Sequence, residues 1–417
     1  MADVFKDPRK LEYLNAEGAD RPLRSPIPHS TLVAARGYRK RRIVEQVVAH
    51  DCTAILLFDP VNIRYALDAR NMQLWAAHNP FHYALVFADG HGIDFEYRGS
   101  EHLVAGLETV DEVRPAYAWF YQYSAENLPE WVGTWADEIV SALREREAGP
   151  LRLAVDKLEP PGVDALRRRG VTLVEGQELT ENARLIKSPE EIELMRWTIR
   201  VCEAGMARIY EASVAGRSEQ EIWAELHHEN ARSGGEWLET RLLTAGERTN
   251  PWFQECSDHV AARGDMLAFD TDMIGPYGYC ADLSRSWTID HVAMTREQRA
   301  LYAAALEQIE HNVALIRPGM DWREYSERSW PIPERYLANR YSCLLHGVGM
   351  CDEYPGVYAP QDAADFQAGR FEPGMVLAAE SLIGEEGGRE AVKLETQVLV
   401  TATGAERLDS FPWEDDV

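Results

Sequence analysis

The chain has 417 residues, and its 69 Asp and Glu against 43 Lys and Arg give a formal net charge of −26. An acidic excess of this size repels phosphate backbones and anionic lipid headgroups, which argues against nucleic acid or a membrane surface as a partner. Because 45% of the residues are hydrophobic and a domain takes roughly 100–200 residues, we expect two or three globular domains.

The six cysteines are far apart in the sequence and form no C-x-x-C pair, which favours a reducing compartment. The first residues lack the apolar segment of a signal peptide, and no uninterrupted apolar stretch approaches the ~20 residues that span a bilayer. We therefore expect a cytoplasmic protein.

Residues 1–30 are rich in Pro, Arg and Asp and have no hydrophobic periodicity, so they are expected to form an irregular arm. Beyond the arm, helical and strand patterns alternate as in an α/β domain, which we place at residues 31–185. The expected helices are 31–50 and 128–144, and the expected strands are 52–58, 83–87, 151–155 and 169–175.

A helix start is predicted at Ser188, which can cap the helix, with Pro189 in the first turn and Glu191 completing a capping box. The helix is expected to run to about Ala212 and to open an α+β domain at residues 186–417. The further elements expected there are a capped helix at 218–227, a helix at 295–315, and strands at 375–382 and 391–401.

Isolated acidic residues interrupt the apolar strands of this second domain. Asp270 and Asp272 are two positions apart, which on one extended strand places both carboxylates on the same face. Asp282 lies on a second strand, beyond the turn Gly275-Pro-Tyr-Gly278. The sequence therefore predicts a hairpin on which three carboxylates converge.

Glu380 and Glu395 stand in two further strands, and His346 lies in a glycine-rich segment. Five carboxylates cannot be buried together without neutralisation, because an unpaired buried charge is costly. A pair of divalent transition-metal ions, held about 3.5–4 Å apart by bridging carboxylates, would supply the positive charge. The other histidines lack ligand spacing and are expected to be structural or surface residues.

Several short motifs together resemble the pita-bread metallopeptidase superfamily, which includes creatinase, prolidase and the aminopeptidases that cleave beside proline. They are Phe58-Asp-Pro-Val-Asn-Ile-Arg-Tyr65, Ile186-Lys-Ser-Pro-Glu-Glu-Ile192, Asp282-Leu-Ser-Arg-Ser286, His346-Gly-Val-Gly349, Glu372-Pro-Gly-Met375 and Lys393-Leu-Glu395. The resemblance implies an α/β creatinase-like N-terminal domain and an α+β C-terminal pita-bread domain. The family's metal ligands correspond here to Asp270 or Asp272, Asp282, His346, Glu380 and Glu395.

Three departures from that resemblance argue against peptide hydrolysis. The peptidases carry His-Glu a few residues beyond the metal-binding histidine, and this chain has Asp352-Glu353. Asn250 replaces the histidine expected before the first metal aspartate, and Ser381-Leu382 replaces the usual Pro-Gly after Glu380.

The same departures resemble one non-peptidase branch, the DddP-type dimethylsulfoniopropionate lyases. The matching segments are Asn71-Met-Gln-Leu-Trp75, Asn79-Pro-Phe81, Gly235-Glu-Trp-Leu-Glu-Thr-Arg241, Asn250-Pro-Trp-Phe-Gln-Glu-Cys256, Phe269-Asp-Thr-Asp272 and His346-Gly-Val-Gly-Met-Cys-Asp-Glu353. In that branch both Asp270 and Asp272 would bind metal. The resemblance implies two divalent ions, with iron as the native metal and zinc, manganese, cobalt or nickel as alternatives. It also implies a homodimer and a small zwitterionic substrate, which is cleaved to dimethyl sulfide and acrylate.

Cleavage of such a substrate is a β-elimination, in which a base removes a proton from the carbon next to the carboxylate. Asp352, six residues past His346 and outside the ligand set, is the candidate base. The alternative is that Asp352 only supports the metal ligands.

The sulfonium group offers no hydrogen-bond donor, and aromatic faces can recognise it through cation–π attraction of ~0.5–2 kcal/mol each. The aromatic residues beside the motifs are Trp75, Trp252, Phe253, Tyr341 and Tyr354, with Tyr341 the first choice for a substrate contact. For each of them, packing in the core is the competing interpretation.

The leading hypothesis is thus a metal-dependent lyase for dimethylsulfoniopropionate. The first alternative is a Xaa-Pro dipeptidase or aminopeptidase with altered residues around the metals. Two further alternatives are a catalytically silent binding protein on the same fold, and a lyase or hydrolase for another small cationic carboxylate such as a betaine or creatine analogue.

Overall fold

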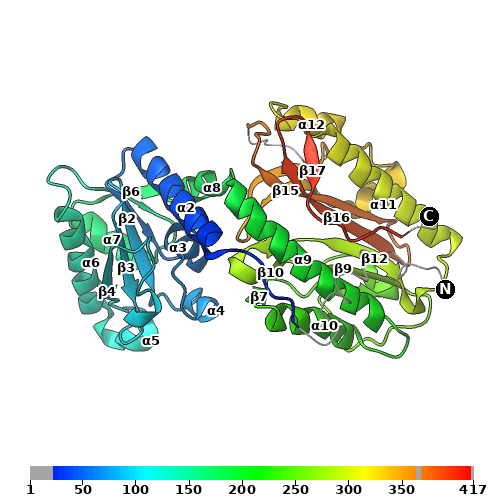
Figure 1. Ribbon diagram of the computed structural model, residues 1–417, viewed down its shortest axis with the longest axis horizontal. Coiled ribbons are helices and arrows are strands. Elements are labelled where there is room, and N and C mark those ends of the chain that lie inside the picture. The colour runs from blue at the N-terminus through cyan, green and yellow to red at the C-terminus, as the bar shows by residue number, and fades with distance from the viewer. Residues whose placement is uncertain (1–21, 363–367, 415–417) are drawn as a thin grey trace. The chain divides into compact units, whose positions relative to one another are not determined.

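The computed structural model of the protein describes residues 22–362 and 368–414. The chain divides into two compact units, with one formed by Pro28–Arg184 and the other containing Leu185 and the residues that follow (Figure 1). Most of the predicted arm, residues 1–21, lies outside the described residues, and the first described helix begins at His29. Among the described helices, none is long and apolar enough to cross a membrane.

The first unit is built on a six-stranded sheet of order β4-β3-β2-β1-β5-β6. Its strands are β1 Ala54–Leu57, β2 Tyr83–Phe87, β3 Gly92–Glu96, β4 Glu112–Pro115, β5 Arg152–Val155 and β6 Thr172–Glu175. Its helices are α2 His29–Ala49, α3 Pro60–Leu67, α4 Gln73–Ala76, α5 Tyr121–Ser124, α6 Leu128–Arg144, α7 Pro160–Arg168 and α8 Gln177–Arg184. The elements predicted here are present, and β3, β4, α3 and α7 are among those that the sequence analysis did not predict.

The second unit begins with the predicted capping box. Ser188 Oγ accepts a hydrogen bond from the Glu191 backbone N–H at 3.2 Å, and Glu191 Oε2 accepts one from the Ser188 N–H at 3.0 Å. Because these bonds satisfy free N–H groups at the helix start, α9 runs from Pro189 to Ala212. The other helices of this unit are α10 Glu219–Arg232, α11 Arg296–Leu315 and α12 Trp322–Arg328.

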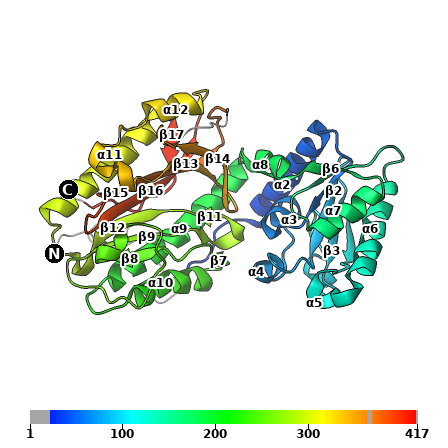
Figure 2. The same cartoon turned by 180° about the vertical axis from the view of Figure 1, so that it is seen from behind.

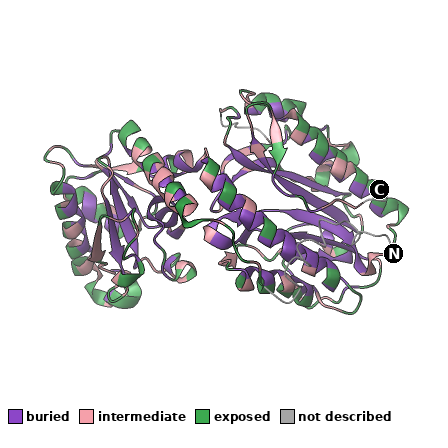
Figure 3. Cartoon of the chain, in the orientation of Figure 1, coloured by how far each residue is buried: buried purple, intermediate pink, exposed green. Residues whose placement is uncertain are grey.

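Within the described part of the second unit, three sheets form the interior, with strand orders β11-β10-β7, β12-β9-β8 and β14-β13-β15-β16-β17. The strands are β7 Trp237–Leu238, β8 Leu243–Ala245, β9 Met266–Asp270, β10 Met273–Ile274, β11 Cys280–Ala281 and β12 Ser284–Thr288, followed by β13 Cys343–Val348, β14 Asp352–Tyr358, β15 Val376–Gly384, β16 Ala391–Val400 and β17 Ala405–Arg407. Every residue of β9, β12 and β15 is buried (Figure 3).

The helices of the second unit lie outside its sheets. Helix α11 covers one side of β15 and β16, while β9 and β12 contact β16 from the other side (Figures 1 and 2). Helices α9 and α10 pack against each other and lie beyond β9 and β12 in both views. The central strands therefore hold the acidic residues in the interior of this unit.

Candidate metal centre and active site

The predicted hairpin carries the first three carboxylates. Strand β9 pairs with β12, with Asp270 opposite Ser284, and the short β10 pairs with β11 just before Asp282. The single extended strand expected through Asp272 is wrong, because β9 ends at Asp270 and Asp272 has a φ of +33°. The kink separates β9 from β10, and Asp272 Oδ2 there accepts a hydrogen bond from Thr240 Oγ1.

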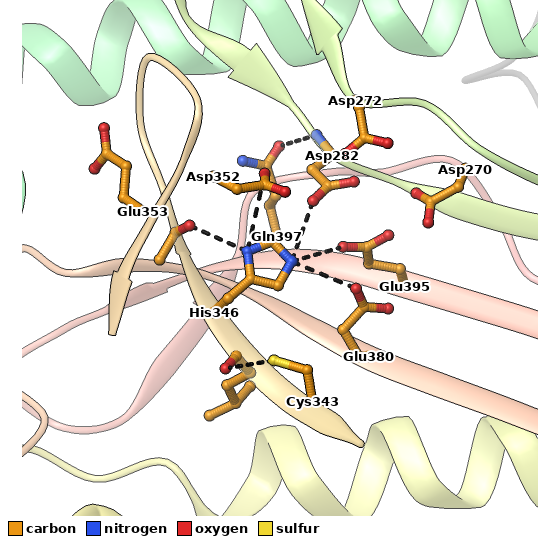
Figure 4. A network of polar contacts seen from close by, with 12 residues as sticks. Asp270, Asp272, Asp282, Cys343, His346, Asp352, Glu353, Glu380, Glu395 and Gln397 are labelled. Atoms are coloured by element: carbon orange, nitrogen blue, oxygen red, sulfur yellow. Dashed lines mark hydrogen bonds and ion pairs between the residues drawn. The ribbon is translucent and has the colours of Figure 1, made fainter. Parts of the chain in front are cut away.

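Two longer strands bring the remaining ligand candidates together. In the antiparallel pair β15–β16, Glu380 lies directly opposite Glu395. Strand β13 flanks β15 on its other side, with His346 opposite Ala378, two residues before Glu380. Since side chains two positions apart share one face of a strand, His346 and both glutamates project to the same side (Figure 4).

The imidazole of His346 lies among the carboxylates. Its Nε2 atom is 3.3 Å from Asp282 Oδ2, 3.4 Å from Glu380 Oε1 and 3.9 Å from Glu395 Oε1 (Figure 4). Its Nδ1 atom lies 3.1 Å from the carbonyl oxygen of Gly347. A proton on Nδ1, donated to that carbonyl, would leave the Nε2 lone pair facing the carboxylates, as a metal ligand requires.

The cluster has the donor set and the unsatisfied atoms of a metal centre. Asp270, Asp282 and Glu395 each offer an oxygen within 4.8 Å of the others, and so do the donor atoms of His346, Glu380 and Glu395. Asp270 Oδ1, Asp282 Oδ1 and Glu395 Oε1 are buried, and none of them has a hydrogen-bond partner among the described residues. Buried polar atoms are normally satisfied, so these oxygens fit ligands of divalent cations.

The pKa shifts point to the same excess of negative charge. Burial, together with neighbouring carboxylates, raises the pKa values of Asp272, Asp282 and Glu395 well above their usual range. Burial alone would lower the pKa of His346, but the hydrogen bond to Glu380 and the nearby carboxylate charges raise it to about 10. A bound cation would oppose the part of each shift that comes from neighbouring carboxylates.

Lys393 is a member of the site that the sequence analysis did not assign. Its fully buried Nζ atom lies 2.5 Å from Glu380 Oε2, 3.0 Å from Asp270 Oδ2 and 3.2 Å from Glu395 Oε2. Lys393 thus contacts one oxygen of each carboxylate and leaves the other oxygen toward the cluster. The sequence signal that could have identified Lys393 is its position two residues before Glu395 on β16, which places both side chains on the same face of the strand.

Asp352 enters the site on a second hairpin. Strands β13 and β14 are joined by three residues, and Val348 lies opposite Asp352 in their register. Asp352 Oδ1 lies 3.9 Å from His346 Nδ1, and 55% of the Asp352 side chain remains exposed. Partial removal from water raises the pKa of Asp352, His346 lowers it, and the charges of Asp270 and Glu380 raise it, so the net direction is upward.

A buried ion pair fixes the residue that follows. Glu353 Oε2 lies 2.9 Å from Lys187 Nζ, and Glu353 Oε1 accepts a hydrogen bond from the Met350 N–H at 3.0 Å. Because both side chains of the ion pair are almost fully buried, they hold the β13–β14 turn. This arrangement sets the position from which Asp352 reaches His346.

The predicted aromatic residues occupy different environments. Tyr341 lies beside the carboxylate cluster, with its ring centroid 5.2 Å from Lys393 Nζ and 5.4 Å from the ring of Phe253, which is 66% exposed. Trp252 is buried in a hydrophobic cluster of Ala268, Leu382 and Ala391, against which Tyr341 packs.

The other two aromatic residues have partners of their own. Tyr354 meets the ring of Trp322 edge to face at 5.4 Å. Trp75 belongs to the first unit, where it packs against Phe81 and Phe120. Of the five aromatic side chains, Tyr341 therefore lies beside Lys393, and Phe253 stacks on Tyr341 with its own ring exposed.

Comparison with known proteins identifies the family. Residues 193–402 match Metallopeptidase family M24. The dimethylsulfoniopropionate lyase DddP of Roseovarius nubinhibens is 42% identical over 388 residues, which cover 91% of this chain and 86% of that protein. The protein of the same name from Roseobacter denitrificans is 41% identical, over 92% of this chain and 87% of its own length.

Solved structures show the same fold at low sequence identity. The Xaa-Pro dipeptidase from Bacillus anthracis has a TM-score of 0.72 at 19% identity, covering 91% of this chain and 99% of that chain. The prolidase from Pyrococcus furiosus has a TM-score of 0.69 at 19% identity, covering 88% and 99%. The predicted creatinase-like and pita-bread architecture is thereby confirmed. The chain belongs to metallopeptidase family M24 and, within it, to the family of the dimethylsulfoniopropionate lyases DddP.

Proposed function

We propose that the protein is a metal-dependent lyase that cleaves dimethylsulfoniopropionate to dimethyl sulfide and acrylate. The observation that carries the proposal is the position of Asp352. Its partly exposed carboxylate has a raised pKa and lies 3.9 Å from the imidazole of His346. The identity of 42% to a protein named dimethylsulfoniopropionate lyase supports the choice of substrate.

The residues proposed to hold the metal are Asp270, Asp272, Asp282, His346, Glu380 and Glu395. Five carboxylates against the single ammonium of Lys393 leave four negative charges when all are ionised, which two divalent cations would balance. An imidazole among carboxylates suits first-row transition metals, and we propose iron as the native ion. The bound ions would act as Lewis acids toward the substrate carboxylate.

Asp352 acts as the general base in this proposal. It takes the proton from the carbon next to the substrate carboxylate, and the electrons of that C–H bond form the carbon–carbon double bond of acrylate. The neighbouring carbon–sulfur bond breaks, and its electron pair leaves on sulfur as neutral dimethyl sulfide. Asp352 then releases the proton to water through its exposed side.

Tyr341 is proposed to recognise the sulfonium. Its ring already faces a cation, the Lys393 ammonium, at 5.2 Å from the ring centroid, a distance at which cation–π attraction operates. Phe253, stacked on Tyr341 and exposed, extends the aromatic surface outward. A zwitterion would then be bound with its carboxylate toward the metal ligands and its sulfonium toward the rings.

The test is to incubate purified, metal-analysed protein with dimethylsulfoniopropionate and to measure dimethyl sulfide in the headspace and acrylate in solution. We expect the two products in equal amounts. A parallel incubation with Xaa-Pro dipeptides tests the peptidase alternative, and release of proline without dimethyl sulfide would reverse the assignment.

We also propose a homodimer in the cytoplasm. Support for the compartment comes from the six cysteines, which form no disulfide within residues 22–362 and 368–414. Sedimentation measurements on the full chain test the dimer, and a single species at the monomer mass would contradict it.

A further inference from the structure

A second group of ionisable side chains is buried in the first unit. His82, Asp94 and Glu96 are 2%, 0% and 0% exposed. In the antiparallel pair β2–β3, Ala84 lies opposite Asp94, and Tyr83 lies opposite Phe95. Because side chains alternate between the two faces of a sheet, His82, Asp94 and Glu96 share one face. Tyr83 and Phe95 stack on each other on the opposite face.

The polar atoms of the three residues converge. His82 Nε2 lies 2.9 Å from Asp94 Oδ1. Each residue offers one nitrogen or oxygen atom, and these three atoms all lie within 4.8 Å of one another. From the sequence, His82 is expected to be a structural or surface residue. The spacing of residues along the chain does not reveal the strand register that brings His82 to Asp94 and Glu96.

One oxygen of each carboxylate has no partner. Asp94 Oδ2 and Glu96 Oε2 are buried without a hydrogen bond, and neither carboxylate has an ion pair with a described arginine or lysine. His82 can supply at most one positive charge against two carboxylates. Burying the remaining negative charge without a cation would be unfavourable.

The other oxygen of Glu96 is fixed from outside the cluster. Glu96 Oε1 accepts hydrogen bonds from Asn71 Nδ2 at 2.9 Å and from the Tyr97 N–H at 2.6 Å. Outer hydrogen bonds that orient a carboxylate while its second oxygen stays free are typical of metal ligands.

We propose that His82, Asp94 and Glu96 bind one divalent transition-metal ion, separate from the centre around His346. The imidazole nitrogen among carboxylate oxygens suits zinc or manganese, whereas calcium and magnesium prefer oxygen ligands alone. The ion has a structural role, since it ties β2 to β3 and, through Asn71, to the segment that leads into α4. The proposal does not depend on the lyase activity.

The test measures bound metal in the full chain after equilibrium dialysis against Zn²⁺. Glu96→Gln keeps an oxygen that can accept from Asn71 and Tyr97 but removes the charge, and Asp94→Asn does the same for the second carboxylate. We expect each variant to bind one ion per chain fewer than the wild type. Glu112→Gln, which removes a half-buried acidic residue of strand β4, is the matched control and should bind as many ions as the wild type.

Anomalous diffraction from zinc-soaked crystals of the wild-type chain is a second test, which locates the bound ion and needs no variant. We expect a peak between His82 Nε2 and the free oxygens of Asp94 and Glu96. Equal stoichiometry in all four proteins, or no peak at this position, would overturn the proposal.

Discussion

Lys393 and Glu380 are joined by a hydrogen bond of 2.5 Å from the ammonium to Oε2, while Glu380 Oε1 lies on the other side, 3.4 Å from His346 Nε2. Glu380 thus binds the Lys393 ammonium through Oε2 and presents Oε1 to the imidazole of His346. Asp270 and Glu395 contact the same ammonium. The positive charge of Lys393 therefore holds three proposed ligands in place.

Lys393→Met should destabilise the protein strongly, because it leaves buried carboxylates without their cation. We expect the free energy of unfolding of chelator-treated protein to fall by about 3–5 kcal/mol in urea titrations. Lys40→Met, which removes the cation of the more exposed pair with Asp111, is the control and should lose at most about 1 kcal/mol. Similar losses in the two variants would contradict the role given to Lys393.

Asp352→Ala and Asp352→Asn should each lower the rate of dimethyl sulfide release at least about 100-fold, which is the usual scale of general-base catalysis. Metal content should stay near that of the wild type, because Asp352 is partly exposed and stands outside the proposed ligand set. Headspace gas chromatography and elemental analysis of the same samples check both expectations. Parallel loss of metal would instead make Asp352 a ligand.

The pH profile follows from the raised pKa of Asp352. A general base works in its ionised form, so kcat/KM should rise with pH through a pKa above the usual value of about 3.9 for Asp. The rise should be absent from the residual activity of Asp352→Ala. A profile of the wild type that is flat through the acidic range would speak against this base.

His346→Ala should lower both the metal content and the rate, since its Nε2 atom lies within 4 Å of three carboxylates of the cluster. A matched control is His311→Ala, which removes an exposed ring whose Nε2 atom lies 3.0 Å from the Arg328 carbonyl oxygen. The control should keep wild-type metal content and rate. Elemental analysis that found full metal in His346→Ala would remove the histidine from the ligand set.

Tyr341→Ala should raise KM for dimethylsulfoniopropionate by about 2- to 30-fold, the equivalent of ~0.5–2 kcal/mol of cation–π attraction. Tyr341→Phe keeps the ring face and should stay close to the wild type. Steady-state kinetics on the two variants separate the ring from the hydroxyl group. Equal KM values for the two variants would argue against recognition by the ring.

The sequence predicted the parts of the site that local patterns encode. The Ser188 cap, the hairpin before Asp282 and the strands carrying Glu380 and Glu395 follow from capping chemistry and apolar periodicity. Family resemblance, rather than spacing, singled out Asp352 from the other acids of the chain.

The remaining features depend on contacts between distant segments. The break between β9 and β10 at Asp272 is a backbone conformation that alternating side chains do not reveal. Lys393 becomes part of the site because β16 lies beside β15 and near β9, which places its ammonium among acids up to 123 residues away. His82 meets Glu96 through the register of β2 and β3, which a single sequence does not fix.

The measurement that tests the central claim most directly is a metal titration of activity. Protein stripped by a chelator is supplied with increasing Fe²⁺ without oxygen, and dimethyl sulfide release from dimethylsulfoniopropionate is measured at each step. We predict no release from the stripped protein and full recovery as iron is added, with Asp352→Ala silent throughout. Undiminished release from the metal-free wild type would contradict the account.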